Sequence, residues 1–234
     1  MKMKLLTLDK IVDVAYWCGR LSTPVSIIIA APPGAGKTWS TKSISGVNRV
    51  CYVNTSTSPN EHRKLIASNA PRTSLLINDD IGYFLNRKDE YFVTFGMVID
   101  GRISHTMYKT VQTAVMNCSL ILCCTTEQFF DNLDSLKASG LYSRIVPIIL
   151  GLSAETRADY QKSILSGEIR CTSDPKPRKP APLKRGKPKD SIIHEYDVEP
   201  RMIANIRSMS QYLTEAETEE LILIAHSRRM EYEV

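Results

Sequence analysis

The sequence predicts an α/β domain built around a mostly parallel β-sheet. Short, apolar, β-branched segments alternate along the chain with segments of helical periodicity, which is the pattern of repeated strand–helix units. A turn with the sequence APPGAGKT directly follows the first of these apolar segments. A glycine-rich turn in that position is typical of a loop between a strand and a helix.

The elements follow one another in a regular order. Apolar runs predict strands at 25–31, 49–55, 74–80, 119–126 and 144–152. Helical periodicity predicts helices at 7–21, from Lys37 onward, and at 61–68, 89–101, 127–140 and 153–167, with two more within 199–230. Gly101 is expected to stop the helix before it. Thr214 and Glu217, three residues apart, predict a capping box at the start of the last helix.

The composition fits a folded domain with one unusual segment. The chain has 234 residues, of which 43% are hydrophobic, and a formal net charge of +5. Residues 174–190 contain seven Lys or Arg and two Asp, so this segment alone carries +5 and the rest of the chain balances to zero. Five prolines in the same segment predict an extended, mobile chain without a packed core. Attraction for polyanions is expected to centre there.

The cysteines and the apolar segments indicate a cytoplasmic protein. None of the six cysteines forms a C-x-x-C motif, so buried thiols in a reducing compartment are expected rather than a zinc site. Cys123 and Cys124 are adjacent in a predicted strand and should face opposite sides of the sheet. No segment approaches the roughly 20 apolar residues of a membrane span, so no membrane association is expected.

The turn after the first strand has the chemistry of a phosphate-binding loop. Gly34 and Gly36 let successive backbone N–H groups face a β-phosphate, Lys37 can reach the β- and γ-phosphates, and the Thr38 hydroxyl can ligate Mg²⁺. Ala31 occupies the first position, where the motif has glycine, and is tolerated if its φ stays negative. The residues expected to contact the nucleotide are Pro33, Gly34, Ala35, Gly36, Lys37, Thr38 and Trp39.

A second acidic element supports this site. The segment LLINDD is an apolar strand ending in acid, the Walker B arrangement, in which Asp79 would hold Mg²⁺ mostly through water and Asp80 would polarise the attacking water. Thr125 or Thr126, at the end of the fourth strand, could orient that water, and Thr126 is the first choice. Arg144, just before the last strand, could reach a neighbouring subunit's γ-phosphate. The structural alternatives are a turn or helix cap for the two aspartates and a surface charge for Arg144.

Taken in order, these motifs resemble the AAA+ ATPases over residues 8–170 and 198–230. LLINDDIG is similar to the Walker B segment of helicase loaders and transposition ATPases, and EPRMIANI is similar to the lid segment of branch-migration motors. The resemblance implies a 5-1-4-3-2 sheet in a nucleotide-binding domain over 1–152. It also implies a helical lid over 153–234, interrupted by the basic segment at about 171–192, with Arg201 as sensor 2. The departures are Ala31, Asp80 in place of glutamate, and the Pro/Lys insert in the lid.

The same resemblance implies ATP and Mg²⁺ as ligands and a homo-oligomeric ring or spiral, such as a hexamer. A motor or loader acting on nucleic acid, in replication, recombination, transposition or packaging, competes with a protein-remodelling ATPase that acts on a partner protein. NTSTSPNEH, after the second strand, lacks the aromatic pore residue of protein unfoldases. The basic segment and a loop at 104–110, with His105, Tyr108 and Lys109, favour nucleic acid, although a plain linker and a plain surface loop remain alternatives. A kinase or GTPase is disfavoured because the sequence has no N-K-x-D motif.

Overall fold

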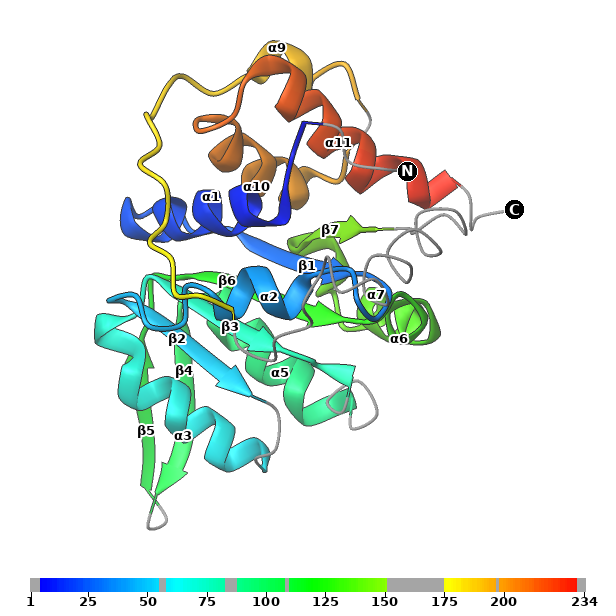
Figure 1. The fold of residues 1–234 in the computed structure, drawn as a ribbon. Coiled ribbons are helices and arrows are strands. Elements are labelled where there is room, and N and C mark those ends of the chain that lie inside the picture. The colour runs from blue at the N-terminus through cyan, green and yellow to red at the C-terminus, as the bar shows by residue number, and fades with distance from the viewer. Residues whose placement is uncertain are drawn as a thin grey trace, which may run out of the picture.

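The protein is built on a parallel five-stranded sheet with helices on both faces. The computed structural model describes residues 5–54, 58–82, 88–107, 110–150, 175–196 and 198–230. The sheet contains β1 (Ser26–Ala30), β2 (Val50–Asn54), β3 (Leu75–Asp79), β6 (Ser119–Cys124) and β7 (Val146–Ile149), in the order β2-β3-β6-β1-β7 (Figure 1). Every neighbouring pair is parallel. Numbered in chain order and read from β7, this is the 5-1-4-3-2 order, so the predicted α/β class with a five-stranded parallel sheet in this strand order is confirmed.

Two hydrophobic cores lie on opposite faces of the sheet. Most of these strand residues are buried on both faces, which explains why the strands appear in the sequence as apolar runs. One core joins α1 (Leu8–Arg20) and the C-terminal helices to the sheet, and the other joins α3 (Pro59–Asn69) and α5 (Lys88–Ile99) to it. Cys123 belongs to the first core and Cys124 to the second, as the alternation along a strand predicts.

The helix ends follow the sequence signals with one difference. Gly101, at φ +78°, follows α5. Thr214 precedes α11 (Glu215–Met230) and forms the predicted capping box, in which its N–H donates to the Glu217 side chain at 2.8 Å and its hydroxyl accepts from Glu217 N–H at 3.3 Å. The helix predicted at 127–140 is instead two helices, α6 (Thr126–Asp131) and α7 (Leu133–Ala138), which divide at Asn132. The helix predicted at 153–167 lies outside the described residues. The shorter elements are α2 (Lys37–Lys42), α9 (Asp190–Ile193), and the 3-10 turns η1 (Ala70–Arg72) and η2 (Tyr142–Arg144).

Residues 104–110 are not the simple loop that the sequence predicts. β4 (Arg102–Met107) and β5 (Thr110–Val115) form an antiparallel hairpin outside the main sheet. Ile103 of β4 is fully buried against the core that contains α3 and α5, whereas β5 is exposed along almost its whole length. The hairpin was missed because only one of its strands has a buried face. His105 belongs to β4, and Tyr108 and Lys109 lie outside the described residues.

Residues 175–189, which we call the strap, are extended but packed. The Arg178 guanidinium pairs with Asp13 of α1, its backbone N–H donates to the Ser43 carbonyl at 2.8 Å, and the Trp17 indole donates to the Ala181 carbonyl at 2.7 Å. Asp13 is 4% exposed, and burial raises the pKa of its carboxyl against the opposing effect of Arg178. The predicted extended chain is confirmed, and the prediction that it does not pack is wrong.

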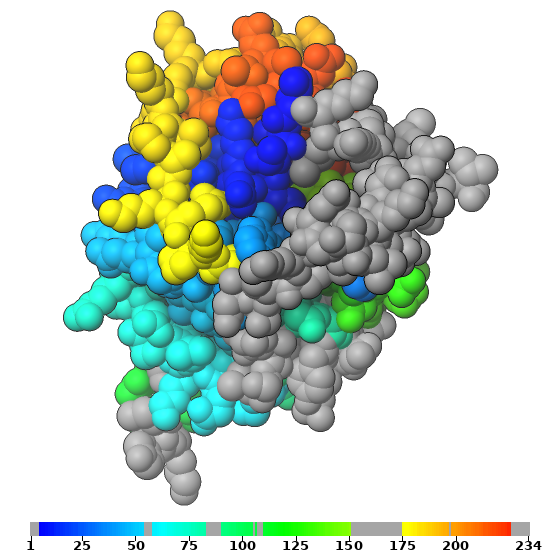
Figure 2. All heavy atoms as spheres, viewed as in Figure 1, coloured from blue at the N-terminus to red at the C-terminus, as the bar shows by residue number. Residues whose placement is uncertain are grey.

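The strap runs past α1 to α9, the first of the C-terminal helices (Figure 1). Figure 2 shows it on the surface beside α1 and reaching the C-terminal helices. Those helices, α9, α10 (Pro200–Ser210) and α11, share a core with α1 and the sheet, through side chains such as Met202, Ile206 and Leu221. None of the described helices is both long and apolar enough to cross a membrane.

Candidate functional site

The predicted site residues gather at the carboxyl ends of three adjacent strands. β6 lies between β1 and β3, with Ala30 of β1 opposite Cys124 and Asn78 of β3 opposite Leu122. The loop after β1, the acidic end of β3 and the threonines after β6 therefore meet at one edge of the sheet. This edge is where ligands bind in open parallel sheets.

The loop after β1 has the backbone geometry that its glycines predict. Gly34 has φ +81° and Gly36 has φ +85°, in the left-handed region where a side chain is strained. A Cβ added at Gly36 would meet no described atom within 4 Å, so the space beside this turn is open. Ala31 is not among the residues with positive φ and is fully buried, with its N–H donating to the Cys124 carbonyl. The condition for alanine at this position is therefore met.

Lys37 lies folded against this loop. Its ammonium donates to the carbonyls of Ala31 and Pro32, the latter at 3.1 Å. Partial burial lowers its pKa, and the acidic side chains nearby, including Asp79 and Asp80, oppose that shift. The amine thus bonds to the loop, and the carboxylates at the end of β3 are near enough to act on its charge. The neighbouring predicted contacts Pro33, Gly34, Thr38 and Trp39 are exposed, and Ala35 and Gly36 are partly buried.

Asp79 has a partner that the sequence analysis missed. Its side chain is buried, and Oδ2 accepts a hydrogen bond of 2.6 Å from the Tyr52 hydroxyl. Burial, followed by this hydrogen bond, raises the pKa of Tyr52, so the phenol stays a donor. Tyr52 pairs with Ile77, two residues before Asp79, so the tyrosine and the aspartate share a face of the sheet. A polar aromatic residue on the neighbouring strand was the signal available in the sequence.

Asp80 differs sharply from Asp79. It is exposed, has φ +58°, and its Oδ1 accepts a hydrogen bond of 3.3 Å from Gly82 N–H. Gly82 lies against Gln128, because a Cβ added there would be 1.9 Å from the amide nitrogen of that side chain. The turn after β3 therefore packs closely on α6, with the Asp80 carboxylate left at the surface.

The two threonines after β6 have different surroundings. The Thr125 hydroxyl caps α6 by accepting from Gln128 N–H at 3.1 Å, and Gln128 accepts from Thr125 N–H at 2.9 Å. Thr126 Oγ1 donates to the Leu150 carbonyl at 3.5 Å. Thr125 thus has a structural role as a cap, whereas Thr126 makes one long hydrogen bond.

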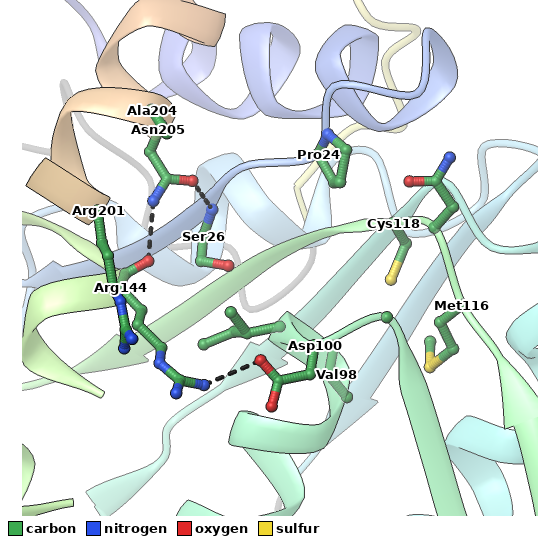
Figure 3. Close-up of a pocket in the computed structure, with 13 residues that line it drawn as sticks. Pro24, Ser26, Val98, Asp100, Met116, Cys118, Arg144, Arg201, Ala204 and Asn205 are labelled. Carbon is green, nitrogen blue, oxygen red and sulfur yellow. Dashed lines mark hydrogen bonds and ion pairs between the residues drawn. The ribbon is translucent and has the colours of Figure 1, made fainter. Parts of the chain in front are cut away.

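Arg144 and Arg201 are not brought to this edge. Both line a pocket of about 530 Å³ that also contains Ser26, the first residue of β1 (Figure 3). β1 runs from Ser26 to Ala30, so at least about 13 Å of strand separates this pocket from the loop. Neither arginine therefore reaches the phosphate loop of its own chain. For Arg201, this position does not support the sensor 2 role inferred from the sequence, which acts within one subunit.

No family model matches the chain, and no curated protein matches it in a sequence search. We therefore base its function on the residues and their geometry.

The chemistry of these residues suits a nucleoside triphosphate with Mg²⁺. The two left-handed glycines shape an open turn, and Lys37 supplies a positive charge beside it. Mg²⁺ prefers oxygen ligands and is usually bound by one or two carboxylates together with substrate phosphates. The Asp79 carboxylate and the exposed Thr38 hydroxyl are ligands of this kind.

Proposed function

We propose that this protein is a P-loop ATPase of the AAA+ type, which hydrolyses ATP with Mg²⁺ as a homo-oligomer and acts on a nucleic-acid-bound assembly. The observation that carries the proposal is the meeting of the glycine turn and Lys37 with Asp79 and Asp80 across β6. The 5-1-4-3-2 strand order and the C-terminal helices support the AAA+ assignment.

Each residue has a distinct part in the proposed reaction. Backbone N–H groups of the loop would bind the β-phosphate, and Lys37 would bind the β- and γ-phosphates. Thr38 and Asp79 would hold Mg²⁺, which neutralises phosphate charge when bound. The exposed Asp80 carboxylate would accept a hydrogen bond from the attacking water, and Thr126 would help to orient that water.

Tyr52→Phe is expected to weaken Mg²⁺ use without abolishing hydrolysis. The variant removes only the hydroxyl that orients Asp79, and losing such a supporting contact typically costs about 10- to 100-fold in metal affinity or activity. We expect the Mg²⁺ concentration for half-maximal activity to rise by that factor, while the rate at saturating Mg²⁺ changes much less. Tyr16→Phe is the control, because its hydroxyl donates to the Asn48 carbonyl instead. An unchanged Mg²⁺ dependence in Tyr52→Phe would remove Tyr52 from this role.

The strap supports a nucleic-acid substrate, but with fewer free charges than its sequence predicts. Arg178 pairs with Asp13, which compensates its charge, whereas Arg185 keeps its charge and donates to the neutral Gln211 at 2.7 Å. The exposed lysines of the strap are Lys176, Lys179, Lys184 and Lys187. They lie on one extended chain that is held to the protein, which suits sequence-independent contact with a phosphate backbone.

Replacing these four exposed lysines with serine is expected to flatten the salt dependence of DNA binding. Each phosphate neutralised contributes about −0.9 to the slope of log affinity against log salt on duplex DNA, so the slope should become smaller by about 3 to 4. Arg178 is left in place to keep the strap attached. Fluorescence anisotropy across a salt titration measures both slopes. Equal slopes would show that the strap is a structural connection, not a DNA-binding segment.

A second candidate function is the remodelling of a partner protein. Val111 and Val115 of β5 are 67% and 79% exposed, and because they are four residues apart on one strand they share a face that can contact an apolar surface. The two candidates separate in one assay, in which ATP hydrolysis is measured alone and with single-stranded DNA, duplex DNA or a disordered protein. We expect stimulation by DNA. Stimulation only by protein would favour the second candidate, and no Mg²⁺-dependent hydrolysis in any condition would contradict the ATPase assignment.

A further inference from the structure

The pocket at the amino end of β1 contains two arginines and one opposing carboxylate. Arg144 enters it from η2, and its Nη1 lies 2.9 Å from Asp100 Oδ1. Arg201 enters it from the first turn of α10, and both guanidinium groups extend to the same side (Figure 3). Among the described residues, no hydrogen bond or ion pair is assigned to Arg201.

Asn205 fixes α10, the helix that carries Arg201, beside Arg144. The Asn205 amide donates to the Arg144 carbonyl at 2.8 Å, and its Oδ1 accepts from Ser26 N–H at 3.0 Å. Arg201 precedes Asn205 by four residues on α10, so both lie on the same face of that helix. The contact that fixes α10 on η2 and β1 therefore also turns Arg201 toward Arg144.

The charge in this pocket favours an anion. Among the described residues that line the pocket there are two guanidinium groups and one carboxylate, Asp100, which pairs with Arg144 alone and whose side chain is 50% exposed. Like charges in one partly enclosed space repel each other more strongly than in bulk water. Arginine forks match the oxygens of phosphate groups in two-point hydrogen bonds. A terminal phosphate would offset the uncompensated positive charge.

The position of the pocket indicates where that phosphate comes from. It lies at the amino ends of the strands, whereas the phosphate loop lies at their carboxyl ends. In a head-to-tail assembly of identical subunits, opposite surfaces of the protein face each other at every interface. This arrangement can bring the arginine pocket of one copy to the phosphate loop of the next.

We propose that Arg201 acts across the subunit interface together with Arg144, and that their pocket receives the terminal phosphate of a nucleotide held by a neighbouring copy. This rests on the proposed ATPase function and replaces the sensor 2 role of Arg201 within its own chain. Loss of one preorganised donor of this kind costs about 10²- to 10³-fold in rate, which we expect for Arg201→Ala. Arg207→Ala is the control, because Arg207 is on the same helix but pairs with Asp190.

Mixing experiments identify the subunit on which Arg201 acts. Arg201→Ala mixed with Lys37→Ala should recover activity, because each variant supplies the half of the site that the other lacks. Random neighbours in a closed assembly give up to about a quarter of the wild-type rate. Arg144→Ala mixed with Arg201→Ala should not recover, because no neighbour then supplies both arginines.

Two results would contradict a role of Arg201 across the interface. Recovery in the mixture of the two arginine variants would show that Arg201 serves its own chain's site and would overturn the proposal. A wild-type rate for Arg201→Ala alone would also overturn it. Co-purification of tagged and untagged subunits verifies mixing, and Arg201→Gln replaces the alanine variant if that one fails to assemble. A wild type without ATPase activity would instead refute the proposed function itself.

Discussion

Arg144→Ala is expected to lower the rate of ATP hydrolysis by about 10³- to 10⁵-fold, the range for an arginine that stabilises a phosphoryl-transfer transition state. We expect this effect to act across subunits, because Arg144 lies at the opposite edge of the sheet from the loop after β1 in its own chain. ATP binding by the isolated subunit should therefore change little. The wild type should also show specific activity that rises with protein concentration.

Steady-state hydrolysis and nucleotide binding, measured on the same Arg144→Ala preparation, check this expectation. Arg72→Ala is a matched control, because it removes an exposed arginine from η1, outside the pocket. Activity should return when Arg144→Ala subunits are mixed with Lys37→Ala subunits. No recovery at any ratio, with both variants in one assembly, would remove Arg144 from the role across the interface.

Asp80→Asn is expected to bind ATP normally and to hydrolyse it about 10²- to 10⁴-fold more slowly, the usual contribution of a positioned general base. Asp80 is exposed and lies in the left-handed region at φ +58°. Asparagine tolerates that conformation as well as aspartate does, so the turn and the fold should persist. The variant thus isolates the charge of the carboxylate.

Single-turnover hydrolysis with a parallel binding titration separates the two effects of Asp80→Asn. Asp131→Asn is the control, since Asp131 is an exposed acid at the end of α6. Full hydrolysis by Asp80→Asn would show that another group activates the water.

The sequence predicted the sheet well because most of its strands are buried on both faces. Such strands appear as apolar runs, and a glycine turn after the first one indicated the candidate site. The sequence did not predict the hairpin of β4 and β5, because β5 is exposed and has no strong apolar face. The hydrophobic pattern of a segment therefore predicts a strand well where the strand is fully buried and poorly where it is only partly buried.

Long-range contacts account for the other differences. Arg178 pairs with Asp13, which lies 165 residues earlier in the sequence. Because composition does not show such a contact, it predicted a mobile chain where the structure has a packed strap. The edge on which α10 packs depends on Asn205 meeting Arg144 and Ser26. The order of motifs along the chain contains no information on that contact, so it could not show that Arg201 lies beside Arg144.

The central claim, that the loop after β1 binds the phosphates of ATP, is tested most directly by titrating a fluorescent ATP analogue with Mg²⁺ into wild type and Lys37→Ala. The wild type should bind, and the variant should bind about 10²-fold more weakly or not at all, because a desolvated charge contact costs roughly 2–5 kcal/mol when one partner is removed. Lys42→Ala, which removes the same charge from the other end of α2, should bind like the wild type. Equal affinity of wild type and Lys37→Ala would contradict the claim.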